Sequence, residues 1–211
     1  MALSVNTNYA SLTAQNNLQA SQTRLTASLE RLSTGLKINS ASDDPSGLVT
    51  ASLQASQISG LSTAIQNIQT GTSLAKTADS SLKNINDLLV QIRTLAANSA
   101  NTATQSASSL AANVASAAAL LGSIDNIANT TKFGTVALLD GTFTAQQFQT
   151  GAFSGQTSAL TIAKADSTTL AVNAIDLGTS GGATAALTAI DAAITTIAMP
   201  AEASVPSFPV C

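Results

Sequence analysis

Apolar residues recur at alternating spacings of three and four positions along much of the first 130 residues of this 211-residue chain. That repeat is typical of helices that pack along other helices, so it predicts a mainly α protein, an elongated rod or bundle of long, coiled-coil-like helices. The clearest run, which we call the leucine seam, consists of Leu18, Leu25, Leu29, Leu32 and Leu36. Polar Asn16 and Gln22 interrupt the pattern, so it fits either an ordinary amphipathic helix or a coiled-coil strand.

Further stretches with the same periodicity extend along the chain. They predict helices over about 48–98 and 106–129, and a last helix from about residue 183. Gly71 interrupts the first of these stretches and predicts a bend or a frayed turn there, because glycine weakens a helix interior. After Met199 the pattern gives way to a proline-rich tail, so Pro200 is expected to end the last helix.

The middle of the chain lacks the helical repeat and differs in composition. Asp140-Gly141 is typical of a β-hairpin turn, and the Thr-, Ser- and Gly-rich residues 154–184 predict short strands and loops, with 179–182 as a linker. The predicted organisation is a helix over 1–40, a helical core over 41–132, a β-hairpin and variable middle over 133–184, the start of a C-terminal helix over 185–199 and an aberrant tail over 200–211.

The composition argues against several classes of function. The chain has no histidine and a single cysteine, Cys211, so we expect no catalytic site, no cofactor and no metal site. A net charge of −3 argues against nucleic acid as a partner. No continuous run of about 18 apolar residues is present, and the N-terminus lacks the features of a signal peptide, so membrane insertion is not expected. An enzyme using the neighbouring Asp43 and Asp44 is disfavoured because adjacent carboxylates do not face each other.

A run of turn-forming residues separates the first two helical stretches. Asn, Ser, Asp, Pro and Gly side chains compete with the helical backbone ladder, and glycine reaches conformations that other residues adopt only at a cost. We therefore predict a hinge, whose residues are Gly35, Asn39, Asp43, Asp44 and Gly47.

Residues 32–47, read as one string (LSTGLKINSASDDPSG), resemble the box found in this place in bacterial flagellins. The stretches 91–101 and 124–134 resemble the same family. The resemblance covers residues 1 to about 142 strongly and the start of the last helix moderately.

The resemblance implies a structural subunit that self-assembles into the extracellular flagellar filament. The implied partners are other flagellin subunits, an export chaperone and the flagellar export apparatus, through which the chain would leave the cell without a signal peptide. The seam helix would pair with a C-terminal helix, and the variable middle would face solvent. The alternatives are a hook–filament junction protein, a non-assembling truncated flagellin and, from the Thr/Ser-rich middle alone, a partly disordered secreted adhesin.

Two departures from the family accompany the resemblance. Gln91 stands where receptor-recognised flagellins carry a basic residue, although Arg93 and Leu95 are retained, so these three residues are candidates for inter-subunit or receptor contact. The long final helix of the family is missing or replaced by the proline-rich tail.

Overall fold

The structure is a computed structural model that describes residues 9–101, 103 and 105–203. It confirms the prediction of a mainly α protein with long helices and a small β region. The helices are α1 (Tyr9–Thr34), α2 (Pro45–Ala100), α3 (Ala107–Thr130) and α4 (Ser180–Ala203). The strands are β1 (Lys132–Phe133), β2 (Val136–Ala137), β3 (Gln146–Gln149) and β4 (Thr157–Leu160).

The chain divides into two compact units, Met1–Ile58 and Ser59–Cys211, and the boundary falls inside α2. In the described part of the first unit, α1 is followed by a link and by the first turns of α2. Gly35 ends α1, since its φ of +70° suits glycine and its amide donates to the Arg31 carbonyl oxygen over 2.9 Å. No residue of α1 is buried.

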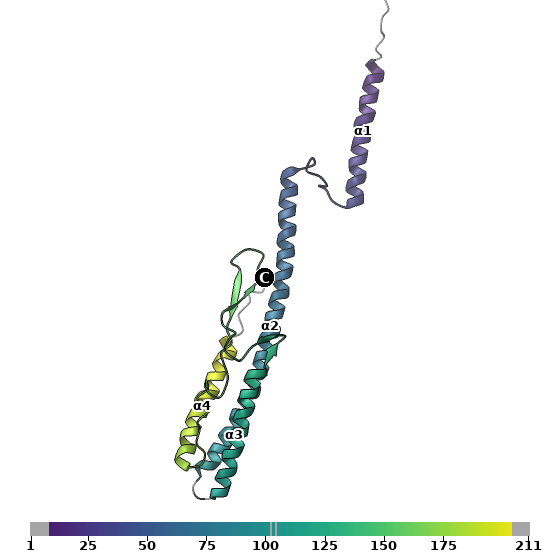
Figure 1. The fold of residues 1–211 in the computed structure, drawn as a ribbon. Helices are drawn as coiled ribbons and strands as arrows, with labels where there is room; N and C mark the ends of the chain where they lie inside the picture. Colours follow the sequence, from purple (N-terminus) through teal and green to yellow (C-terminus); the bar gives the residue numbers. More distant parts are fainter. Residues whose placement is uncertain (1–8, 102, 104, 204–211) are drawn as a thin grey trace, which may run out of the picture. The chain divides into compact units, whose positions relative to one another are not determined.

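The second unit contains the hydrophobic core, built where α2, α3 and α4 lie side by side (Figure 1). Each helix contributes fully buried apolar side chains from the face that its periodicity predicts: Ile85, Leu89 and Ile92 from α2, Ile124 from α3 and Ile190 from α4. Side chains of this kind each contribute about 1.5–3 kcal/mol on burial, so the second unit has a folding energy source of its own.

Both sheets are two-stranded antiparallel hairpins. In the first, Lys132 pairs with Ala137 and Phe133 with Val136, and Gly134 supplies a φ of +62° in the turn. The expected hairpin turn at Asp140-Gly141 is therefore wrong: Asp140 instead accepts a hydrogen bond from the Thr142 amide, which closes a local turn. The second hairpin pairs β3 with β4, from Gln146 opposite Leu160 to Gln149 opposite Thr157.

The Thr/Ser/Gly-rich middle is not simply a solvent-facing segment. Regularly placed apolar residues among the small polar ones turn inward and join the core; they are Leu160, Ile162, Ala165, Leu170, Val172 and Leu177. Because the neighbouring residues are rich in Thr, Ser and Gly, the sequence did not indicate that these apolar side chains belong to the core.

The helix α2 runs through Gly71 without interruption, so the expected frayed turn is wrong. A Cβ at this position would lie 3.3 Å from Cδ1 of Phe148, so the glycine gives the β3 aromatic ring close access to α2. Asn67 donates to the Gln149 carbonyl oxygen over 3.3 Å nearby. These contacts place the β3–β4 hairpin along α2.

Both ends of α4 differ from expectation. The supposed linker over 179–182 is a helix start, in which the Thr179 side chain accepts a hydrogen bond from the Gly182 amide over 3.1 Å. At the other end the helix extends through Pro200 to Ala203, so the expected stop at Pro200 is wrong. The rest of the predicted tail, residues 204–211, lies outside the described residues.

Candidate functional site

The leucine seam is exposed on α1. The exposed fractions of its side chains range from 57% for Leu29 to 81% for Leu32. Leu18, Leu25, Leu29 and Leu32 share a helical face by their spacing of seven, four and three. Leu36 lies beyond the end of α1 and past the left-handed Gly35, so it does not continue that face. The seam that the helix presents therefore ends at Leu32.

The apolar exposure continues past the link. Val49 and Leu53, on the first turns of α2, are 60% and 59% exposed. No charged residue occurs between Asp44 and Lys76. Large exposed apolar side chains on a neutral helix surface are typical of a surface that another protein covers.

Asp43 organises the link between the two helices. Its carboxylate accepts hydrogen bonds from the Asn39 and Ser40 amides, each over 3.2 Å, and from the Arg31 guanidinium over 3.4 Å. The Asn39 amide bond, then that of Ser40, lowers the pKa of Asp43 below its ordinary value, with a smaller contribution from Arg31. The aspartate thus fixes a turn by binding its backbone.

Asp44 caps the start of α2. Its carboxylate accepts from the Gly47 amide over 3.0 Å and from the Ser46 hydroxyl over 2.9 Å, and Pro45 occupies the first helical position. The Gly47 hydrogen bond is the main cause that lowers the pKa of Asp44. The two carboxylates therefore bind different backbone segments.

Glycine is required at position 47 for a different reason from the one expected. It is the third residue of α2 and has ordinary helical conformation, so no unusual backbone geometry requires glycine. A Cβ there would meet the Asp44 carboxylate and lie 2.7 Å from Cδ1 of Ile38. Glycine is needed for space, whereas Gly35 is needed for its positive φ.

The three candidate contact residues of α2 do not form one surface. Arg93 is bound to α4, with its Nε 2.7 Å and its Nη2 3.4 Å from the two carboxylate oxygens of Asp191. This ion pair raises the pKa of Arg93 and lowers that of Asp191. Gln91 and Leu95 instead line a shallow groove of about 500 Å³ between α2 and α3. The structure therefore brings Gln91 and Leu95 together and separates Arg93 from them.

Sequence reasoning missed the polar contacts between elements distant in the chain. Asp125 of α3 accepts from the Ser167 amide over 2.8 Å and from its hydroxyl over 2.9 Å, which fixes the loop before α4 on the helix. The solitary charge in the otherwise uncharged stretch between Arg93 and Lys132 was the available signal, but nothing in the sequence identified its partner.

Two helices of the described chain reach the length and mean hydropathy of a membrane-spanning segment, Ala107–Thr130 and Ser180–Ala198. Core helices of soluble proteins pass the same test. Ser, Thr and Asn interrupt the first segment, and Thr and Asp191 interrupt the second, so neither is a continuous run of large apolar residues.

Most of the chain is similar to known proteins of one family. A family model described as the bacterial flagellin N-terminal helical region matches residues 5–144. The B-type flagellin of Pseudomonas aeruginosa is 41% identical over 170 residues, which are 81% of this chain and 35% of that protein. Flagellin D of Vibrio cholerae is 40% identical over 162 residues, which are 77% of this chain and 43% of that protein.

A solved structure is similar as well. The crystal structure of Bacillus cereus flagellin aligns with a TM-score of 0.58 and 29% identity, over 65% of this chain and 80% of that one. The chain spans less than half the length of the curated relatives named above. These relatives all carry flagellin names, and no similarity found here favours a hook–filament junction protein.

Proposed function

This chain belongs to the bacterial flagellin family, and from that premise we propose that it is a structural subunit of the flagellar filament. The observation that carries the proposal is the exposed leucine seam on α1, which lies inside the region that matches the family. An isolated helix gains most of its stability from packing, and burial of one leucine contributes about 1.5–3 kcal/mol. The seam is therefore a surface that needs another helix to cover it.

The proposed partner is a homopolymer of flagellin subunits. The neutral surface of α2 before Lys76 supports this partner, because uncharged Ser, Thr, Gln and Asn side chains can be buried against a second protein without the cost of burying a charge. We infer that the groove lined by Gln91 and Leu95 is a secondary contact surface within the same polymer.

The link around Asp43 and Asp44 would join the seam helix to the rest of the subunit. Hinge motion would be concentrated at Gly35, because the hydrogen bonds of Asp43 and Asp44 hold residues 39–47. Export through the flagellar apparatus with the help of a chaperone, and a final extracellular location, belong to the same proposal.

Seeded assembly tests the proposed function. The purified full chain, with Cys211 kept reduced, would be mixed with fragments of a flagellin filament, and incorporation followed by sedimentation and electron microscopy. We expect the Leu25→Ser/Leu29→Ser double variant to lose incorporation at least tenfold, because it removes two adjacent seam contacts. The matched control, Thr23→Ser, changes an exposed polar residue on the other face of the same helix and should incorporate normally.

Two results would contradict the proposal. Equal incorporation of the seam variant and the control would show that the seam is not an assembly surface. Failure of the unmodified chain to enter or extend seeds at any concentration would favour the non-assembling alternative instead.

A further inference from the structure

The second unit presents an aromatic side chain on a hydrogen-bonded loop. Phe153 lies between β3 and β4 and is 55% exposed. Its amide donates to Oε1 of Gln156 over 3.0 Å, and its carbonyl oxygen accepts from Nε2 of Gln149 over 2.7 Å. The same Gln149 nitrogen donates to the Gly151 carbonyl oxygen over 2.8 Å. The loop is thus held in place without help from the phenylalanine ring, which leaves the ring available to a partner at low conformational cost.

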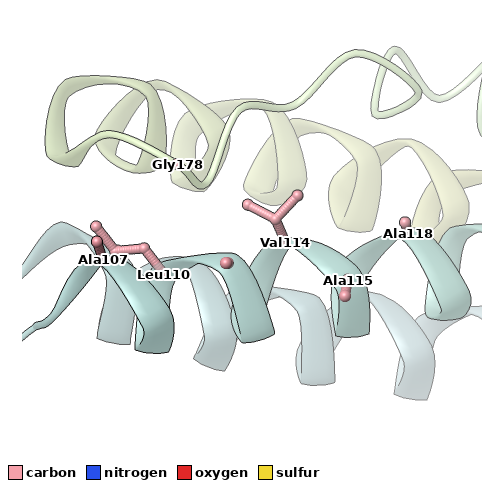
Figure 2. A pocket seen from close by; sticks show the side chains of 7 residues that line it. Ala107, Leu110, Val114, Ala115, Ala118 and Gly178 are labelled. Atoms are coloured by element: carbon pink, nitrogen blue, oxygen red, sulfur yellow. The ribbon is translucent and has the colours of Figure 1, made fainter.

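An apolar groove lies on α3 beside the loop that precedes α4. Figure 2 shows Val114 standing up from the helix toward the loop, with Gly178 on the opposite side of the groove. Its volume is about 420 Å³, and its lining residues are Ala107, Leu110, Ala111, Val114, Ala115, Ala118 and Gly178. No side chain of this lining carries a charge or a side-chain hydrogen-bonding group, so the groove suits an apolar side chain and nothing ionic.

Phe153 and the groove lie at opposite ends of the second unit. Ala152 would be 3.1 Å from a Cβ at Gly60 of α2, so the loop is beside that residue. At the other end, Asn113 of α3 donates to the Ser99 hydroxyl of α2 over 3.0 Å, which places the groove helix there. Gly60 and Ser99 are 39 residues apart on one helix, or roughly 60 Å at about 1.5 Å per residue. Figure 1 shows the β3–β4 hairpin at one of these ends and the start of α3 at the other. Phe153 therefore cannot reach the groove of its own chain.

We propose that Phe153 of one copy inserts into the α3 groove of a second copy, which lies displaced along the direction of α2. The contact joins two different surfaces, so its repetition generates an open, polar chain of subunits rather than a closed dimer. This inference rests on the proposed filament function and adds a specific end-to-end contact to it.

The area that one phenylalanine buries is too small for a stable dimer but suits one of several contacts in a polymer. A phenylalanine side chain buries about 150–250 Å², whereas a stable pairwise interface needs about 1,200 Å² or more. The contact alone would leave the protein monomeric in dilute solution, and it would form only in concentrated solution or where the seam already holds subunits together. No charge occurs between Asp140 and Lys164 around the aromatic, nor between Arg93 and Asp125 around the groove, so no charged side chain from these stretches is desolvated.

Site-directed crosslinking tests the contact in the full chain. In a Cys211→Ser background, one preparation carries Ser154→Cys beside the aromatic and the other carries Ala115→Cys in the groove. A short bismaleimide joins them in concentrated mixtures, and peptide mass spectrometry identifies the linked pair. We expect the 154–115 product to exceed the 154–154 product several-fold, and Phe153→Ser, added to the first chain, to reduce it several-fold. The matched control is Val136→Ser, which removes another exposed apolar residue, 47% exposed on β2, and should leave the yield unchanged.

Equal yields with and without Phe153, or an excess of 154–154 product, would overturn the contact. The seeded assembly experiment separates this failure from that of the proposed function. Incorporation into filaments without the Phe153-dependent crosslink would reject the contact alone. A Phe153-dependent crosslink in a chain that never enters filaments would reject the filament function and retain the contact.

Discussion

The two units of this chain carry the same helical repeat but use it differently. In α1 the seam leucines are all more than half exposed, whereas Ile85, Leu89 and Ile92 of α2 are completely buried. The spacing of apolar residues is similar in both, so periodicity alone does not separate a core from an assembly surface. The difference is the partner: α3, α4 and the middle segment cover α2 in the second unit, and no described segment buries α1.

The largest expected contrast is in monomer stability. Ile92→Ala removes a fully buried side chain and should lower the free energy of unfolding by about 2–5 kcal/mol. Leu25→Ala removes a side chain that is 60% exposed and should change the free energy of unfolding by less than about 0.5 kcal/mol. Urea denaturation followed by circular dichroism measures both. A Leu25→Ala loss as large as that of Ile92→Ala would show that α1 is packed in the monomer.

Protease sensitivity should divide along the same boundary. Trypsin sites in the first unit are Arg24, Arg31 and Lys37, and we expect cleavage there at least tenfold faster than at Arg93, because no burial protects α1. Arg93 lies on α2 next to the buried Ile92 and is paired with Asp191. Timed digestion with mass spectrometry reports the order of cuts. Similar rates at Arg31 and Arg93 would remove the distinction between the units.

Much of the local structure could be predicted from the sequence, although the contrast in burial could not, and the failures have physical causes. Long helices and the seam follow from local periodicity, and the turn over residues 39–47 follows from residue types that bind their own backbone. The role of Gly71 could not be predicted, because the Phe148 ring that requires it is 77 positions away in the chain. The buried residues of the middle were hidden for the same reason: their partners are distant helices.

The candidate site shows the same limit. The sequence identified Arg93 but not its partner Asp191, since the two are brought together only by the packing of α4 on α2. It identified Asp43 and Asp44 together, and the structure assigns them to different backbone segments. Short-range hydrogen bonding could be predicted, whereas pairing between helices needed the fold.

Acid should weaken the second unit through Asp166. Burial by itself would raise the pKa of this carboxyl, but hydrogen bonds from Lys164, 2.8 Å away, and from Thr169 outweigh it and lower the pKa to about 2. A lowered folded-state pKa stabilises the fold above the unfolded value near 3.8, and that stabilisation is lost as pH falls toward 2. The loss is on the order of 1 kcal/mol, reduced because the Lys164 side chain is 43% exposed.

Urea midpoints between pH 5 and pH 2 would measure this loss, and Asp166→Asn is the matched control that removes the titrating group. The pH dependence should shrink in that variant. Because Asp166 belongs to the second unit, trypsin cleavage at Arg31, compared at neutral pH in wild type and Asp166→Asn, should be unchanged. An unaltered acid slope in Asp166→Asn would mean that other carboxyls dominate.

The smallest expected effect is confined to the start of α2. Asp44→Ala removes the acceptor of the Gly47 amide, so the first turn should fray and the hydrogen exchange of that amide should accelerate several-fold. Asp44→Asn keeps a side-chain oxygen at the same position and should largely preserve protection. The amides of Ile85 and Leu89, deep in the second unit, should exchange at wild-type rates in both variants, because the cap stabilises the helix end only locally. If Asp44→Ala also accelerated exchange at Leu89, the start of α2 and the core would unfold as one cooperative element, and the separation into two units would not describe how this chain opens.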